Sequence, residues 1–372
     1  MTKLCQHFGA CGGCTLQNVD YPLQLQQKAQ TIASLFNLSP SSTPLSPYPP
    51  IPLPSPETFF YRNRMDFAFG PNYSIGLKDK KNNIINIEKC LLMSDKCNAV
   101  LNRLRYFIQY KKLKNYKDGL LRHVVIREGK NIDNCIINLL TSDKGVFPLE
   151  ELWEKTKDLV NGVIWSVNLS AADRSYGDIK QFFGQDYLME SLNGLKFKIP
   201  AQSFFQTNTK QAEVLIQVVQ EFAGLSGQET VLDLYSGTGS IGLSLAHKAK
   251  EVIGIEENQP AAQLSLENAK LNNIANYSAL AGKVEDLLDK MNEKDDLIVL
   301  DPPRPGVSKK VITKIGRARP AKVIYVSCNP ESQKHDIDKL REWGYGIEKI
   351  QPLDMFPYTP HIENVVLLTV NI

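Results

Sequence analysis

Residues 229–240 read ETVLDLYSGTGS, a short apolar run that ends in a glycine-rich turn and leads into a helix-forming stretch. Three further apolar runs follow, EVIGIEEN at 251–258, DDLIVLDPP at 295–303 and AKVIYVSCNP at 321–330. Buried strands that alternate with helices form an open parallel sheet with helices on both faces. The sequence therefore predicts an α/β domain over residues 199–372.

The glycine turn is the first candidate ligand site, because ligands of such sheets bind at the carboxyl ends of the strands. Gly237 and Gly239 let a ligand approach the backbone, and Glu256 ends the next strand, where a ribose diol would lie. Gly242 also permits the third-glycine pattern of a dinucleotide site, and a turn that binds nothing is the other alternative. The acidic Asp233 before the turn suits an amine-bearing ligand better than a pyrophosphate, so we expect S-adenosylmethionine (SAM).

Two further strand ends carry reactive side chains. Asp301 follows the run LIVL and Cys328 follows KVIYVS, so a carboxylate and a thiol are expected at neighbouring strand tips. An aspartate in this position can instead cap the next helix, and an isolated cysteine is often a small buried hydrophobe. Cys328 is therefore a candidate nucleophile, with a small buried hydrophobic residue as the alternative.

The chain before the α/β pattern contains a helix, a connector and many short strands. Asp20 is placed to cap the helix, and prolines then forbid regular structure up to about residue 56. Short apolar runs separated by turns predict a mainly antiparallel sheet, with helical stretches near 94–110 and 149–160. The expected segments are a cysteine-rich loop (1–18), a helix with a proline-rich connector (19–56), a β-rich central domain (57–198) and the α/β domain (199–372).

The cysteine-rich loop is a candidate metal or cluster site. Seven cysteines in a chain without a membrane span or signal-peptide core are expected to be ligands or nucleophiles rather than disulfides. Cys11 and Cys14 form a CxxC pair and Cys5 supplies a third thiol, while Cys90 is the first candidate for a fourth ligand and Cys97 the runner-up. Spacing alone does not separate a four-cysteine zinc site from a [4Fe-4S] cluster.

A basic, aromatic-rich stretch of the central domain is the candidate RNA contact. The net charge of +3 names no partner, but nine lysines and arginines lie at 103–130 against two acidic residues, Asp118 and Glu128. Tyr106, Phe107, Tyr110 and Tyr116 are interleaved and could stack on bases, although a solvated charged face is the alternative. Weaker candidates for receiving a target base are Tyr61-Arg62-Asn63-Arg64 and Phe204-Phe205.

Six motifs occur in order along the chain, and together they resemble the iron-sulfur-containing RNA uracil-C5 methyltransferases. The resemblance implies a Rossmann-like SAM-dependent methyltransferase domain, a β-rich central domain and an N-terminal iron-sulfur loop. The motifs are Cys5-x5-Cys11-Gly-Gly-Cys14, SFFQTN (203–208), LDLYSGTGS (232–240), DPPRPG (301–306), SCNP (327–330) and HIEN (361–364).

The resemblance implies a covalent mechanism with two catalytic residues. Carbon 5 of uracil is too weak a nucleophile to attack the methyl group of SAM, so the Cys328 thiolate would first add to carbon 6. Glu363 would then remove the proton from carbon 5, which allows the cysteine to leave.

The resemblance also implies the cofactors and their ligands. It favours a [4Fe-4S] cluster over zinc, with a structural role, because the methyl transfer needs no electron. One departure is Ala281-Gly282-Lys283, which stands where relatives often place a polar or acidic contact to adenine, so that contact is in doubt. The implied residues are Gln206, Tyr235, Ser240, Glu256 and Asp301 for SAM, and Cys5, Cys11, Cys14 and Cys90 for the cluster.

The expected partner is RNA, in a cytoplasmic protein with no membrane contact and no obligate protein partner. Because the chain begins directly at the cysteine loop, without the small β-barrel domain of some relatives, 23S ribosomal RNA is the expected target. The alternatives are the T loop of transfer RNA, methylation of a base amino group, and a noncatalytic RNA-binding iron-sulfur protein. Arg304 disfavours amino methylation, since that class places an aromatic residue after its prolines; Cys328 and Glu363 disfavour a noncatalytic role.

Overall fold

The computed structural model describes residues 4–39, 49–114, 119–170, 173–288 and 296–370, and the chain divides into two compact units. The units are described separately, and the domain boundaries expected from the sequence stay a prediction. Unit 1 contains Met1–Asn18, Glu57–Ser191 and Lys198–Thr209, and unit 2 contains Val19–Pro56, Leu192–Phe197 and Lys210–Ile372.

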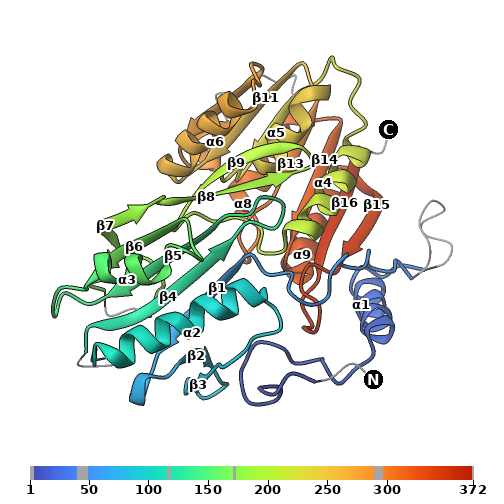
Figure 1. Cartoon of the computed structure of the whole chain (residues 1–372). Helices are drawn as coiled ribbons and strands as arrows, with labels where there is room; N and C mark the ends of the chain where they lie inside the picture. Colours follow the sequence, from blue (N-terminus) through green and yellow to red (C-terminus); the bar gives the residue numbers. More distant parts are fainter. Residues whose placement is uncertain (1–3, 40–48, 115–118, 171–172, 289–295, 371–372) are drawn as a thin grey trace. The chain divides into compact units, whose positions relative to one another are not determined.

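A mixed seven-stranded sheet forms the centre of unit 1 (Figure 1). Its order is β3-β2-β1-β4-β5-β6-β7, and all neighbours are antiparallel except β5 and β6. This confirms the mainly antiparallel pattern predicted from the short apolar runs. The strands are β1 (Arg64–Phe69), β2 (Ile75–Lys78), β3 (Ile84–Asn86), β4 (Leu121–Glu128), β5 (Cys135–Thr141), β6 (Gly162–Val167) and β7 (Asp178–Gly184), with a 3-10 turn, η1, at Pro71–Tyr73.

Two helices cover this sheet, as the periodicity predicted: α2 (Asp95–Tyr110) and α3 (Leu149–Thr156). The Ser94 hydroxyl caps α2 by accepting a hydrogen bond from the Cys97 backbone N–H at 3.1 Å. Apolar residues at helical spacing on α2 join the core of the unit. A separate two-stranded sheet of β8 (Tyr187–Leu192) and β9 (Leu195–Pro200) follows, and its residues divide between the units.

The sheet of unit 2 has the order β12-β11-β10-β13-β14-β16-β15. The first five strands are parallel, as predicted, whereas β16 runs antiparallel to both of its neighbours, β14 and β15. The reason is that residues 354–362 return the chain directly, without the crossover that parallel neighbours require. The strands are β10 (Thr230–Leu234), β11 (Glu251–Glu256), β12 (Tyr277–Ala281), β13 (Leu297–Leu300), β14 (Lys322–Ser327), β15 (Tyr345–Leu353) and β16 (Glu363–Val370).

Helices pack on this sheet through alternate strand residues. Leu232 and Leu234 share one core with α1, α7, α8 and α9, while Asp233 between them belongs to the other side of β10. Asp20 precedes α1, but its side chain makes no capping hydrogen bond, so that part of the helix prediction is wrong. The helices are α1 (Tyr21–Leu35), α4 (Thr209–Ala223), α5 (Ser240–Leu245), the 3-10 turn η2 (Ala246–Lys248), α6 (Gln259–Leu271), α7 (Val284–Leu287), α8 (Lys309–Ala318) and α9 (Pro330–Arg341). Within the described ranges, no helix is long and apolar enough to cross a membrane.

Candidate active site

Three acidic or nucleophilic side chains lie at one edge of the unit 2 sheet. Asp301 directly follows β13, Cys328 directly follows β14, and Glu363 begins β16. Because β14 and β16 are antiparallel, with Ser327 paired to Asn364, the end of one strand meets the start of the other. The fold thus brings together the two strand-tip residues expected from the sequence and the carboxylate implied by the family resemblance.

The electrostatics of this edge follow from burial and from like charge. Burial raises the pKa of the Cys328 thiol to about 11, and Glu363 and Asp301 add to the effect while Arg304 opposes it. Burial raises the pKa of Asp301 to about 7. The Glu363 side chain is 2% exposed, and burial, followed by Asp301, raises its pKa well above the ordinary value. A carboxyl group with a pKa near 7, such as Asp301, can exchange protons near neutral pH, which suits acid-base chemistry beside a thiol.

The loop after Asp301 is braced against the helix that follows Cys328. The Arg304 carbonyl accepts hydrogen bonds from the Asn329 side-chain amide and the Ser332 hydroxyl, each at 3.0 Å. Asp336 accepts from the Val307 backbone N–H at 2.7 Å and from the Tyr325 hydroxyl at 2.8 Å. Sequence reasoning missed these residues, because no local pattern indicates that α9 carries a buried acceptor for another loop.

The glycine turn has the strained backbone of a ligand-binding loop. Gly237 and Gly239 have φ values of 55° and 84°, and Tyr235 also has a positive φ, 64°, which is costly for an aromatic residue. Ser240 begins α5 directly after the turn. Glu256 accepts a hydrogen bond from the Gly237 backbone N–H at 2.9 Å, so the acid expected at the ribose lies at this turn.

The Asp233 side chain was expected to face a ligand, but it is buried within the fold. Its side chain is 1% exposed and accepts a hydrogen bond from the Gly242 backbone N–H at 2.9 Å, which ties β10 to α5. A Cβ on Gly242 would lie 2.6 Å from the Asp233 carboxylate, so this glycine is explained by close packing rather than by a pyrophosphate. Burial raises the pKa of Asp233 to about 7, with smaller contributions from Asp301 and Glu256.

Gln206 belongs to unit 1, whereas Tyr235, Ser240, Glu256 and Asp301 belong to unit 2. The Gln206 carbonyl accepts a hydrogen bond from the Asn63 side-chain amide at 2.8 Å. Its own side chain is half-buried and has no hydrogen bond to any residue in the described part of the chain. The side chain is therefore available to a ligand, while the backbone is fixed.

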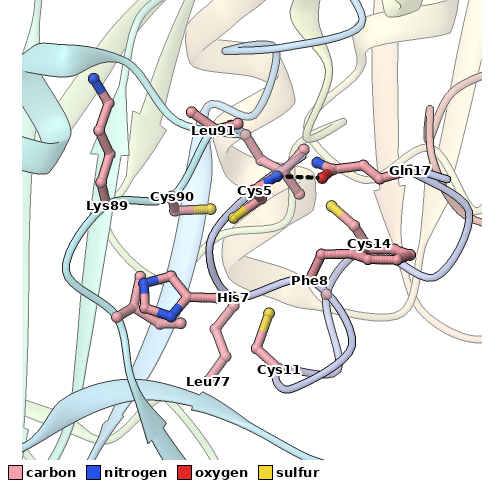
Figure 2. A pocket seen from close by; sticks show the side chains of 13 residues that line it. Cys5, His7, Phe8, Cys11, Cys14, Gln17, Leu77, Lys89, Cys90 and Leu91 are labelled. Atoms are coloured by element: carbon pink, nitrogen blue, oxygen red, sulfur yellow. Dashed lines mark hydrogen bonds between the residues drawn. The ribbon is translucent and has the colours of Figure 1, made fainter. Parts of the chain in front are cut away.

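Four cysteines line one pocket of unit 1, and Figure 2 shows their sulfur atoms around a common space. They are Cys5, Cys11, Cys14 and Cys90, the four implied by the family resemblance. Burial, followed by the other three thiols, raises the pKa of Cys14 to about 12, and burial is the largest cause that raises the pKa of Cys90 to about 11. The walls of the pocket are mainly apolar, with Phe8, Leu77, Ile87, Leu91 and Leu92 among them.

The runner-up, Cys97, lies elsewhere. A hydrogen bond to Cys135, followed by burial, raises its pKa, and both thiols belong to the hydrophobic core. In the described part of the chain, no group of three or more cysteine, histidine or acidic side chains is arranged to hold a metal ion. Gln17 also lines the pocket; its side-chain oxygen accepts from the Cys5 backbone N–H at 2.9 Å, and its buried Nε2 has no hydrogen-bond partner (Figure 2).

The basic stretch at 103–130 carries less free charge than its composition indicates. Arg127 is 1% exposed, and Arg105 donates to the Ile87 carbonyl at 2.5 Å. Other cations of the stretch form ion pairs with acidic residues that lie near them in space. The pairs are Arg103 with Asp158, Lys111 with Glu151 and Lys130 with Glu128.

The aromatic residues of the candidate RNA contact differ in exposure. Tyr106 and Tyr110 are each 70% exposed, and their rings are nearly parallel with centroids 6.4 Å apart. Phe107 belongs to the core, as do Tyr61 and Phe205, whereas Phe204 is 69% exposed. The remaining residues named from the sequence, Tyr116, Lys117 and Asp118, lie outside the described residues.

Comparison with known proteins identifies the family. The family model described as "tRNA (Uracil-5-)-methyltransferase" matches residues 20–371. An uncharacterized RNA methyltransferase of Clostridium tetani is 38% identical over 97% of this chain and 82% of its own length. The tRNA (uracil(54)-C(5))-methyltransferase of Pyrococcus furiosus is 35% identical over 97% of this chain and 84% of its own length.

A solved structure agrees over nearly the whole chain. The crystal structure of the Pyrococcus abyssi tRNA (uracil-54, C5)-methyltransferase in complex with S-adenosyl-L-homocysteine has a TM-score of 0.84 and 31% identity. The match covers 99% of this chain and 88% of that one. The α/β methyltransferase fold is therefore confirmed. The chain belongs to the tRNA (uracil-5-)-methyltransferase family and is a SAM-dependent RNA uracil-5-methyltransferase.

Proposed function

We propose that this enzyme methylates carbon 5 of a uridine in transfer RNA through a covalent adduct between Cys328 and carbon 6. The observation that carries the proposal is the placement of Cys328, Glu363 and Asp301 at one edge of the unit 2 sheet. This edge therefore contains the nucleophile that the first half of the reaction needs and a carboxyl group that can act as the base in the second half. The arrangement argues against a noncatalytic RNA-binding role, because that role needs neither the thiol nor the carboxyl groups.

In the first half of the reaction, the Cys328 thiol loses its proton and the sulfur bonds to carbon 6. This addition turns the C5–C6 double bond into an enolate, whose carbon 5 attacks the methyl group of SAM; the methyl–sulfur bond breaks and S-adenosylhomocysteine leaves. A pKa of about 11 means that little thiolate exists at neutral pH, so a local proton acceptor assists this step. Asp301, with a pKa of about 7, is suited to that exchange.

In the second half, the Glu363 carboxylate takes the proton from carbon 5 and the C6–S bond breaks, which releases 5-methyluridine and the Cys328 thiolate. Burial, followed by the like charge of Asp301, disfavours the ionised form of Glu363, which raises its pKa and makes the carboxylate a stronger base.

For SAM, we propose Tyr235, Ser240 and Glu256 at the glycine turn of unit 2, together with Asp301 of the same unit. For Gln206 of unit 1, the family resemblance is the basis of the proposed contact with SAM. The positive φ values of the turn and the hydrogen bond from Gly237 to Glu256 support a preformed ligand loop. The free side chain of Gln206 on a fixed backbone supports its role.

We propose that Cys5, Cys11, Cys14 and Cys90 hold a [4Fe-4S] cluster. The family resemblance favours a cluster over zinc, and in a cluster each thiolate binds its own iron. The unpartnered Nε2 of Gln17 fits a donor to a cluster sulfur. Such a cluster would crosslink the N-terminal loop to the segment that contains Cys90, a structural role.

The names of the relatives favour transfer RNA over ribosomal RNA, so the 23S expectation is replaced. The Pyrococcus enzymes are named for uracil 54 of tRNA, and the family description also names tRNA. We infer the same nucleotide as the target here.

The test uses purified enzyme, SAM and two transcripts, a tRNA and a 23S ribosomal RNA fragment, with 5-methyluridine mapped by mass spectrometry. We expect methylation of the tRNA at uridine 54 and none of a transcript with cytidine there. The Glu363→Gln variant should form an adduct with tRNA that survives denaturing electrophoresis but releases little product. Methylation of the ribosomal fragment alone would overturn the tRNA assignment, and full turnover by Glu363→Gln would overturn the role of Glu363.

A further inference from the structure

The backbone around Gln206 is held by buried polar groups that no catalytic role explains. Before Gln206, the buried guanidinium of Arg127 donates hydrogen bonds to the carbonyls of Pro200, Ala201 and Ser203 at 2.8–3.2 Å. After it, Arg62 and Asn208 form an antiparallel bridge. The segment is irregular, so these contacts replace the ladder that a regular element would supply.

Asn63 makes the contacts nearest to Gln206. Its side-chain amide donates to the Gln206 carbonyl at 2.8 Å and to the Thr209 hydroxyl at 2.9 Å. Its backbone N–H donates to the Thr207 carbonyl at 2.9 Å, so one residue binds the carbonyls of two successive peptide groups. Asn63 is 2% exposed, which removes competition from water and makes each lost bond costly.

A buried carboxylate completes the network. Glu190 is fully buried and accepts a hydrogen bond from the Thr209 hydroxyl at 2.9 Å. It also accepts from the backbone N–H groups of Lys130, Asn131 and Ser191 at 2.7–3.0 Å. Because Thr209 donates to Glu190, its oxygen lone pairs are left to accept from Asn63, which fixes the orientation of the Asn63 amide.

Asn63 is itself held from the opposite side. The backbone N–H groups of Phe60 and Arg62 donate to the carbonyls of Leu91 and Leu92, each at 2.8 Å. Leu91 and Leu92 line the pocket of the four thiols. The short segment 60–63 therefore joins the wall of that pocket to the Gln206 loop through unbroken hydrogen bonds.

We propose that Asn63 is a positioning residue that sets SAM affinity by holding the backbone of Gln206, with Thr209 and Glu190 fixing the Asn63 amide. The inference rests on the proposed contact of Gln206 with SAM. It goes beyond that contact, because it assigns a role to three buried residues outside the family motif SFFQTN or at its border.

The test measures SAM dissociation constants by calorimetry, with melting temperatures, on the full chain carrying its native metal content. The variants are Gln206→Ala, Asn63→Ala, the double variant of these, and the pair Thr209→Val and Thr209→Ser. Asn168→Ala is the matched control, since Asn168 is buried in the same unit and its side chain also bonds backbone groups, those of Ser170 and Arg174.

We expect Asn63→Ala and Thr209→Val to raise the dissociation constant about five- to tenfold, as for a lost buried hydrogen bond. Thr209→Ser keeps the hydroxyl and should bind normally, as should Asn168→Ala at a similar loss of melting temperature. The double variant should bind no more weakly than Gln206→Ala, because both changes remove the same contact.

The possible failures are distinct. If Gln206→Ala weakens SAM binding but Asn63→Ala and Thr209→Val change it less than twofold, the positioning role is wrong and the role of Gln206 stands. If Gln206→Ala leaves SAM binding unchanged, the proposed contact is wrong and the inference falls with it. Should Asn63→Ala not fold, the comparison of Thr209→Val with Thr209→Ser decides the question.

Discussion

The catalytic edge of unit 2 and the thiol pocket of unit 1 both contain cysteines whose pKa values are raised by burial. Cys328 and Cys90 have the same pKa, about 11, yet their surroundings differ. Carboxyl groups raise the pKa of Cys328 further, whereas other thiols raise that of Cys90. A carboxyl group can exchange a proton with a thiol during catalysis, while neighbouring thiols in an apolar wall are suited to bind one metal group together. The neighbours of a buried cysteine therefore indicate its chemistry better than its pKa does.

The sharpest way to break this comparison is to remove one thiol from each site. Cys328→Ser should lower methylation by at least about 10⁴-fold, because serine is too weak a nucleophile to add to carbon 6 without a strong base. SAM affinity, measured by calorimetry, should stay within twofold. Cys135→Ala, which removes a core thiol, is the control and should keep most of the activity. Substantial turnover by Cys328→Ser would refute the covalent mechanism.

At the thiol pocket, the expected effect is on stability and metal content. Cys90→Ser should abolish iron binding and destabilise unit 1 by on the order of 3 kcal/mol, or about 6–12 °C in melting temperature. Cys97→Ser should retain iron, because the Cys97 thiol faces Cys135. Iron analysis and calorimetry of anaerobically purified protein measure both quantities. Iron retained by Cys90→Ser and lost by Cys97→Ser would reverse the ligand assignment.

The pH dependence of adduct formation sharpens the electrostatic half of the comparison. Since the pKa of Cys328 is about 11, the thiolate fraction grows about tenfold per pH unit below that value. If the thiol proton left to solvent, the single-turnover rate of adduct formation with 5-fluorouridine tRNA would therefore rise about 100-fold from pH 7 to pH 9. Because Asp301 is proposed to take this proton inside the site, we expect the rate to rise less than about tenfold over that range. Binding of the same RNA, measured in parallel by filter retention with Cys328→Ser, serves as the control. A rise of about 100-fold would mean that the proton leaves to solvent and that Asp301 does not assist the step.

The two sites also show which site residues the sequence predicted and which it did not. Asp301 and Cys328 were predicted at neighbouring strand tips because a parallel sheet aligns the ends of its strands, and the structure places them so. Glu363 came from resemblance alone. It reaches this edge through an antiparallel strand pairing at the end of the chain, which no local pattern predicts.

Other features could not be predicted because partners lie far apart in the sequence. The charge of the basic stretch is reduced by Asp158 and Glu151, which belong to a different segment. Asp233 was expected to face a ligand, but its side chain is buried, and one of its oxygens accepts from the Gly242 backbone N–H within the fold. The network of Asn63, Thr209 and Glu190 joins residues up to 146 positions apart, so local sequence gives no sign of it. Periodicity predicts which face is buried, not which polar groups meet there.

The smallest expected effect concerns Asp233, the buried acid beneath the glycine turn. Its pKa is about 7 in the folded protein and near 4 in an unfolded chain. The unfolded state therefore loses its proton first, so the stability that this group contributes is present below about pH 4 and is lost as the pH rises toward 7. Asp233→Asn keeps an oxygen that accepts from Gly242 but does not titrate. The free energy of unfolding of the wild type should fall relative to this variant by about 1.4 kcal/mol per pH unit between about pH 5 and 7.

Urea denaturation followed by the fluorescence of Trp343 measures this difference in unit 2, in a background where Trp153 and Trp165 of unit 1 are phenylalanine. Asp20→Asn is the matched control, because Asp20 is exposed in the same unit and caps nothing, so its change should leave the pH dependence unaltered. If wild type and Asp233→Asn had parallel profiles, Asp233 would be ionised in the folded protein. The effect of burial on its pKa would then have to be offset by the hydrogen bond from Gly242.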